Sequence, residues 1–133
     1  MKNTMNRRDA REYVMSSVFQ IDALKNWDKF EISDFTTNEE LGEQKTYVET
    51  LIGSVKSNLA DIDNVINTVS DGWTTGRMAK MDLAILRVAA AEIMYIEDVP
   101  KAVAINEAVN VAKKYGSEQS PGFINAILGK IDG

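Results

Sequence analysis

The sequence predicts an all-α protein, and three observations support that prediction. Apolar residues recur at steps of three and four along most of the 133-residue chain, which is the spacing of one helix face. Only two prolines and eight glycines interrupt the chain, and so little punctuation favours long helices over many short strands. The alternating pattern of a strand is not convincing anywhere. We therefore predict six or seven helices and no sheet.

Composition narrows the class of protein. The chain is 44% hydrophobic and 26% charged, a balance typical of a globular domain with a real core. It has no apolar run long enough to span a bilayer, and its charged start lacks the apolar core of a secretory signal. Cysteine and histidine are both absent, which removes thiolate metal sites, disulfides and the commonest general base. We expect no cofactor, no metal, no enzymatic activity and a cytoplasmic location.

The first helix is predicted to begin after Asn6 and to end near Leu24. Asn6 is a good N-cap residue, and Asp9 three positions later is a weak capping-box partner. The segment 25–34 mixes aromatic residues with charges and predicts a short helix packed by its aromatics. The core stripe of the first helix follows helical spacing and contains Ala10, Val14, Val18 and Ile21.

A long second helix is predicted from a capping box at Thr37 and Glu40 to about Ser70. Its apolar face has the steps of a heptad pattern, which suits a helix buried in its own bundle or one that pairs with a partner helix. The face consists of Val48, Ile52, Val55, Leu59, Ile62, Ile66 and Val69.

Asp71 and Gly72 break this helix and mark a boundary. We expect one domain over residues 1–133, made of two packed helical bundles that span approximately 1–70 and 71–133. Trp73, directly after the break, is expected to fill the core beside the joint.

Three further helices follow the break. The first covers 81–96, with Glu92 expected at the edge of its apolar face. Pro100 suits the first position of the next helix, and Gly116 suits its end. Ser120, with a proline behind it, suits the N-cap of a short last helix.

The charge distribution suggests one anionic ligand. The net charge of −5 argues against a general nucleic-acid binder, yet residues 1–11 sum to +3. Arg7, Arg8 and Arg11 lie in the first two helical turns and can converge, although cations there oppose the helix dipole by about 0.3–1 kcal/mol each. A cluster placed against that preference favours binding of phosphate, as in RNA, and a solvated charged helix end is the alternative.

A second candidate site is the helix-to-helix turn KKYGSEQSPGF at 113–123. The start of the last helix offers free backbone N–H groups to an anion. Phe123 could stack on an unpaired base or simply fill the core.

Four segments resemble the NusB family: NRRDAREYVMSSVF at 6–19, DLAILRVAAAEI at 82–93, VPKAVAINEAVNVAKKYG at 99–116 and SPGFINAIL at 120–128. Residues 25–70 match only in helical character. The resemblance implies two packed helical bundles and a role in transcription antitermination. It also implies binding of boxA-type RNA as a complex with NusE, a small-subunit ribosomal protein. That complex acts with RNA polymerase and other Nus factors, notably in ribosomal RNA operons.

The resemblance also assigns site residues by position. Phe19 and Asp82 would face NusE, and the chain alone would be a monomer or homodimer that binds RNA weakly. Asp9 interrupts an arginine run that is often unbroken in the family, which weakens the basic arm. The RNA-facing residues would be Lys2, Arg7, Arg8, Arg11, Gln119, Ser120 and Phe123.

Two other functions remain open at this point. The chain could be a helical protein-interaction module without an RNA role, in which case replacing the arginines would leave partner binding intact. It could also be part of an RNA-cytosine methyltransferase, whose catalytic domain would have to follow Gly133.

Overall fold

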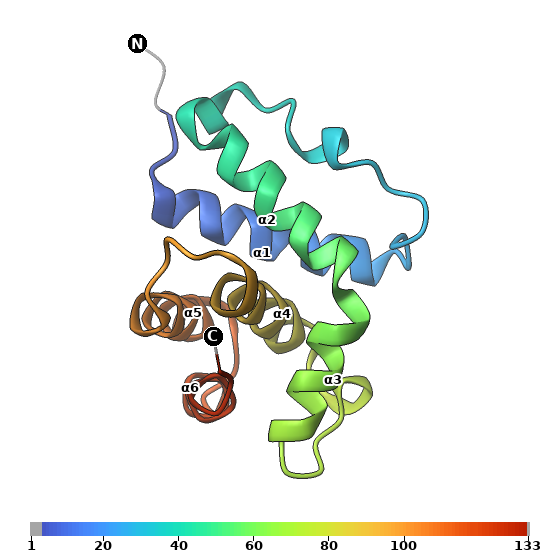
Figure 1. Ribbon diagram of the computed structural model, residues 1–133, viewed down its shortest axis with the longest axis vertical. Helices are drawn as coiled ribbons and strands as arrows, with labels where there is room; N and C mark the ends of the chain where they lie inside the picture. The colour runs from blue at the N-terminus through green and yellow to red at the C-terminus, as the bar shows by residue number, and fades with distance from the viewer. Residues whose placement is uncertain (1–3, 133) are drawn as a thin grey trace.

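The structure is a computed structural model that describes residues 4–132. It contains six α-helices and, within the described residues, no strand, which confirms the predicted all-α class (Figure 1). The α-helices are α1 (Arg7–Ala23), α2 (Lys45–Ser57), α3 (Leu59–Val69), α4 (Lys80–Tyr95), α5 (Lys101–Tyr115) and α6 (Ser120–Gly129). Short 3-10 helices lie between them: η1 (Ile32–Phe35), η2 (Glu39–Gln44) and η3 (Thr75–Arg77).

Helix α4 is the centre of the molecule. It packs against all five other α-helices, with α1 and α2 on one side and α5 and α6 on the other (Figure 1). Every residue of 82–93 is buried. A helix buried all round must be apolar nearly all round, and the alanines of this run suit close packing. Its two central charged residues, Arg87 and Glu92, therefore need partners inside the protein.

The first helix agrees with its prediction. The side chain of Asn6 caps α1 by accepting the backbone N–H of Asp9 at 2.8 Å. Leu24 is the C-cap residue, and the whole predicted stripe is buried.

The predicted single helix over 37–70 is wrong at two places. Its expected start is the 3-10 helix η2, whose N-cap is Asn38 and not Thr37, and α2 begins only at Lys45. The chain also bends at Asn58 between α2 and α3. The Asn58 side chain donates to the carbonyl oxygen of Ser54 at 2.9 Å, and its backbone N–H reaches the same oxygen at 3.1 Å. The side-chain bond competes with the helical ladder for that oxygen. The apolar face still points inward, but it curves around α4 instead of extending as a rod.

The break after α3 is present, whereas the expected position of Trp73 is wrong. Asp71 and Gly72 have φ of 50° and 91°, so this turn needs residues that tolerate the left-handed region. Trp73 is 50% exposed, and Met78 is the buried residue at this joint. The division into bundles at 1–70 and 71–133 stays a prediction, since one buried apolar cluster includes residues from both segments.

Helix α5 begins and ends within one residue of its predicted positions, and α6 begins within one residue of its predicted start. Pro100 is the N-cap of α5, and Ser120 is the first residue of α6. A Cβ atom on Gly116 would lie 2.6 Å from the side chain of Ser120. Glycine is therefore required there by the close approach of the two helices.

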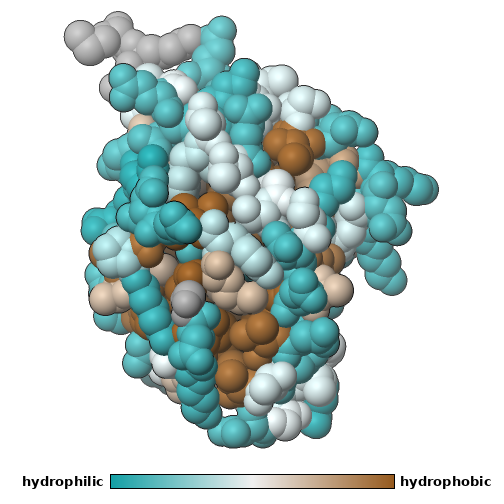
Figure 2. Space-filling model, in the orientation of Figure 1, coloured by the Kyte–Doolittle hydropathy of each residue, from teal (hydrophilic) through white to brown (hydrophobic). Residues whose placement is uncertain are grey.

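The surface is mainly hydrophilic around α1 and α2, while apolar residues gather lower on the same face (Figure 2). Val65, Val69, Met94 and Ile131 line a shallow hollow between α3 and the end of the chain. None of the described helices combines the length and hydropathy needed to cross a bilayer.

Candidate functional site

Arg7 stands at the start of α1 and is exposed. Its guanidinium carbon lies 3.9 Å from the ring centroid of Tyr47, and its Nε donates to Gln44 Oε1 at 2.7 Å. Both contacts are with uncharged groups. Within residues 4–132, Arg7 forms no salt bridge. The predicted contact at Lys2 lies outside the described residues.

Arg8 is exposed as well, but it is paired with a carboxylate. Its Nε and Nη2 donate to Glu107 of α5 at 3.1–3.2 Å. The Arg8 side chain is 69% exposed, against 11% for Glu107. Its Nη1 group forms no hydrogen bond with any described residue, so an anion can approach Arg8 from that side.

Arg11 is buried, and the expectation that three arginines converge on the surface is wrong. It shares the core-facing side of α1 with Val14 and Val18, at helical steps of three and seven. Its Nε lies 2.6 Å from Glu92 Oε1, and its Nη2 lies 3.1 Å from Oε2. With 4% of its surface exposed, Arg11 has no face to offer RNA.

Glu92 is fully buried, which corrects its expected place at the edge of an apolar face. The expectation failed because α4 has no exposed edge at this level. Tyr47 Oη donates to Glu92 Oε2 at 2.8 Å. Burial alone lowers the pKa of Arg11, but the hydrogen bond and charge of Glu92 raise it above the ordinary value. Burial, and then the charge of Glu92, raises the pKa of Tyr47, which keeps its phenol a donor.

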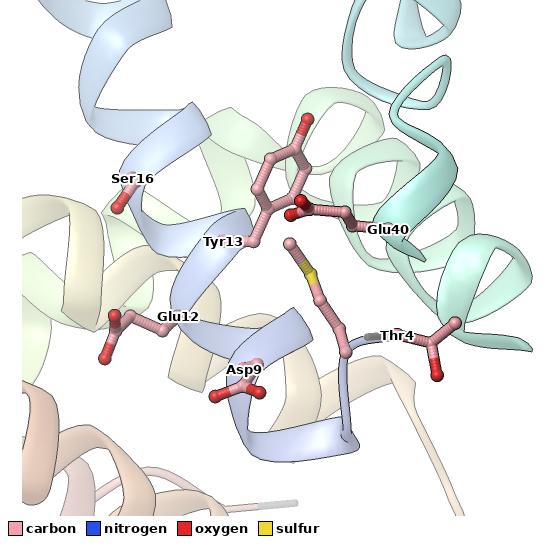
Figure 3. A pocket seen from close by; sticks show the side chains of 7 residues that line it. Thr4, Asp9, Glu12, Tyr13, Ser16 and Glu40 are labelled. Carbon is pink, nitrogen blue, oxygen red and sulfur yellow. The ribbon is translucent and has the colours of Figure 1, made fainter. Parts of the chain in front are cut away.

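Carboxylates surround the basic start of α1. Glu12 accepts hydrogen bonds from Lys114 Nζ at 3.1 and 3.2 Å and from Tyr115 Oη at 2.9 Å. Asp9, Glu12 and Glu40 border a hollow of about 550 Å³ beside α1 (Figure 3). Glu107 and Glu92 pair with Arg8 and Arg11, so these two positive charges are offset by acids from later in the chain. The hollow itself repels phosphate.

A second hollow, of about 390 Å³, lies where α4 and α6 begin. Asp82 is 8% exposed there, and it forms no hydrogen bond or salt bridge through its side chain within the described part of the chain. Phe123 is half-buried and packs against the core. The hollow is lined by Trp73, Arg77, Met78, Ala79, Asp82, Ser117, Gln119, Ser120 and Phe123.

This hollow brings three predicted RNA-facing residues together with one predicted NusE-facing residue. Gln119, Ser120 and Phe123 lie with Asp82, not with the arginines. Arg8 contacts α5 at Glu107, whereas Glu12 contacts the end of α5 at Tyr115. These α5 positions are about 12 Å apart along the helix axis. Along the α1–α5 seam, Arg8 is therefore farther than Glu12 from the hollow, which is lined by Ser117 just beyond Tyr115.

Trp73 and Arg77 also line the hollow, and neither was expected to belong to a functional site. Trp73 is exposed, and the Arg77 guanidinium lies 4.9 Å from its ring centroid. The sequence does contain a signal for this contact, because an arginine follows the aromatic residue by four positions. That spacing lets the two side chains stack where the backbone forms a helical turn.

Phe19 is 37% exposed on α1. One turn further on, Asp22 lies 3.6 Å from Lys80 at the start of α4. Phe19 and Asp82 are thus at the same end of the molecule.

Residues 8–132 match the model of the NusB family. The chain belongs to the NusB family. It is 44% identical over 132 residues to the transcription antitermination protein NusB of Pelotomaculum thermopropionicum, which covers 96% of this chain and 89% of that protein. It is 43% identical over 126 residues to NusB of Thermoanaerobacter sp. strain X514, which covers 94% and 89%.

A solved structure of T. maritima NusB has the same fold. The two structures superpose with a TM-score of 0.88 at 30% sequence identity, covering 96% of this chain and 91% of that one. These relationships confirm the family, the fold class and a role in transcription antitermination. NusB antitermination proteins are not enzymes, which agrees with the expectation from the sequence.

Proposed function

We propose that this NusB protein binds boxA-type single-stranded RNA together with NusE and so promotes read-through by RNA polymerase, notably in ribosomal RNA operons. The observation that carries the proposal is the exposed pair Arg7 and Arg8 at the start of α1. Arg7 has no carboxylate partner among the described residues, and Arg8 keeps one free N–H edge. Exposed guanidinium groups are suited to phosphate.

The RNA strand would follow the α1–α5 seam. Its phosphates would contact Arg7 and Arg8 at one end, and an unpaired base would reach Phe123 at the other. Arg11 has a different role in this proposal, because it holds α1 on α4 through Glu92. The acids between the two ends limit RNA affinity for the chain alone, which supports a need for a protein partner.

NusE would dock at the end of α1 and α4 that carries Phe19 and Asp82. A buried carboxylate that has no partner within residues 4–132 favours a basic side chain from the other protein, and a nearby exposed aromatic suits a hot spot. Because Asp82 and Phe123 line one hollow, a protein bound at Asp82 would lie against the RNA. That proximity supports tighter RNA binding by the heterodimer.

The test is boxA RNA binding with and without NusE at two salt concentrations. We expect the Arg7→Ala/Arg8→Ala variant to bind at least about tenfold more weakly, with a salt slope smaller by about 1.4 for two lost phosphate contacts. A matched control, Lys29→Ala/Lys130→Ala, removes the same charge from distant exposed positions and should change affinity little.

Absence of RNA binding in every mixture of folded protein would overturn the proposal. The chain would then be a helical interaction module, and NusE binding by the arginine variant would establish that role.

A further inference from the structure

The cations near the start of α1 are held in two different ways. Arg8, Arg11 and Lys114 each contact a carboxylate. Arg7 instead contacts an aromatic ring and an amide oxygen. Among the described residues, no direct partner offsets its charge, although its side chain is held in place.

The contacts of Arg7 leave its outer edge free. Stacking on Tyr47 uses the face of the guanidinium, and the bond to Gln44 uses Nε. The Nη1 and Nη2 groups form no hydrogen bond with any described residue. These two groups make the planar fork that binds a phosphate through two parallel bonds.

The Tyr47 side chain is itself held in place by contacts in the core. Its hydroxyl donates to Glu92, which also accepts from Arg11, and the tyrosine is only 8% exposed. The ring therefore has one orientation, set by the buried pair between α1 and α4. A chain of contacts runs from the core through Tyr47 to the surface at Arg7.

We propose that Tyr47 is a positioning residue for RNA binding, whose anchored ring holds the Arg7 guanidinium with its free fork toward an RNA phosphate. This inference rests on the proposed function. Holding a long side chain in its bound conformation lowers the entropy lost on binding. Tyr47 thus raises RNA affinity without contacting RNA, and Arg7 contributes more to that affinity than Arg8 does.

A double-mutant cycle separates this role from a general effect on folding. We expect Tyr47→Leu to weaken boxA RNA binding by the NusE complex about three- to fivefold when Arg7 is present. In the Arg7→Ala background, the same change should leave affinity unchanged. Tyr47→Phe keeps the ring, so its RNA affinity should stay within about twofold of native while its melting temperature falls, because Glu92 loses a donor.

A second variant leaves the core untouched, in case Tyr47→Leu fails to fold. Arg7→Lys retains the charge but loses the planar group that stacks on the ring and forks on phosphate. We expect weaker RNA binding at an unchanged melting temperature and salt slope. Arg8→Lys is the matched control, since Arg8 stacks on no ring among the described residues, and it should have a smaller effect.

The outcomes distinguish this inference from the proposed function. Equal weakening by Tyr47→Leu in both backgrounds, or native affinity in Arg7→Lys, would show that Tyr47 does not position Arg7. An Arg7→Ala variant with native RNA affinity would also reject the inference. Absence of RNA binding by the native complex would instead reject the proposed function.

Discussion

Each end of α1 is joined to α4 by an ion pair between an arginine and a carboxylate. The arginine belongs to α1 at one end and to α4 at the other. Near the N-terminal end, Arg11 of α1 pairs with Glu92 of α4. Near the C-terminal end, Asp22 of α1 pairs with Arg87 of α4, which also binds Asp63 of α3. Each network holds α1 and one of its neighbours onto the central helix.

The two networks differ in their access to water. The side chains of Arg11 and Glu92 are 5% and 0% exposed, whereas those of Asp22 and Asp63 are 17% and 22% exposed. Water can solvate a partly exposed carboxylate that loses its partner, but it cannot reach Glu92. Ion pairs of similar composition can therefore contribute unequally to the stability of the same helix packing.

The N-terminal network should be the more sensitive to loss of one member. Arg11→Leu leaves Glu92 charged and buried, so we expect a loss of about 3–5 kcal/mol in the free energy of unfolding, measured with urea. Arg11→Leu/Glu92→Leu should recover much of that loss, because a buried pair can be replaced by apolar groups. A loss below about 1 kcal/mol in the single variant would mean that water reaches this site.

Replacing one member of the C-terminal network should lower the free energy of unfolding by less. Arg87→Leu removes one partner of Asp22 and of Asp63, and we expect a loss of about 2 kcal/mol in the same urea experiment. Asp22 keeps its contacts with Trp27 and Lys80, and Asp63 is 22% exposed to water. A loss equal to that of Arg11→Leu would remove the distinction between the two ends.

Acid should weaken the C-terminal network through Asp22. Burial alone raises the pKa of Asp22, but hydrogen bonds from Trp27 and Arg87 and the charges of Arg87 and Lys80 lower it overall. The ionised form is therefore favoured by folding. Its contribution is fully present above the ordinary aspartate pKa of about 4 and is lost as the pH falls through the lowered value.

Thermal unfolding between pH 7 and pH 2 measures this effect. Asp22→Asn should be less stable at neutral pH and should show a flatter decline in acid. Asp71→Asn removes an exposed carboxylate at a turn that asparagine tolerates, and its acid profile should match the native one. Identical profiles for native protein and Asp22→Asn would contradict the linkage.

The N-cap of α1 should give the smallest change. Asn6→Ala removes the acceptor for the Asp9 N–H, and we expect a loss of about 1 kcal/mol. Hydrogen exchange should speed up in the first turn of α1 and stay unchanged near Asp22. Asn6→Asp keeps a cap and is the control, and faster exchange along all of α1 would show that the helix opens as one unit.

Much of the fold was predictable because its signals are local. The apolar spacing predicted α1, α4, α5 and α6, and the cap at Asn6, the turn at Asp71–Gly72 and the stop at Gly116 depend on neighbouring residues. The long helix over 37–70 failed at Asn58, where a side chain competes for the backbone. Its apolar spacing continues unchanged through that bend.

The candidate site was predictable only in part. The sequence and its resemblance pointed to Arg7, Arg8, Asp82 and Phe123, and the roles of these residues stay predictions. Contacts between residues that only the fold brings together could not be predicted from the sequence. Trp73 and Arg77 were missed, and Arg11 was expected on the surface.

The sequence by itself determined where helices form and where the chain turns, because those preferences act within a few residues. Only the tertiary structure decided which charges are buried and which are exposed. Arg11 meets a carboxylate 81 positions away, and Tyr47 reaches the same carboxylate across 45 positions. Such pairings depend on how α1 and α2 pack against α4, since burial makes a charge costly unless a partner from another helix is within hydrogen-bonding distance.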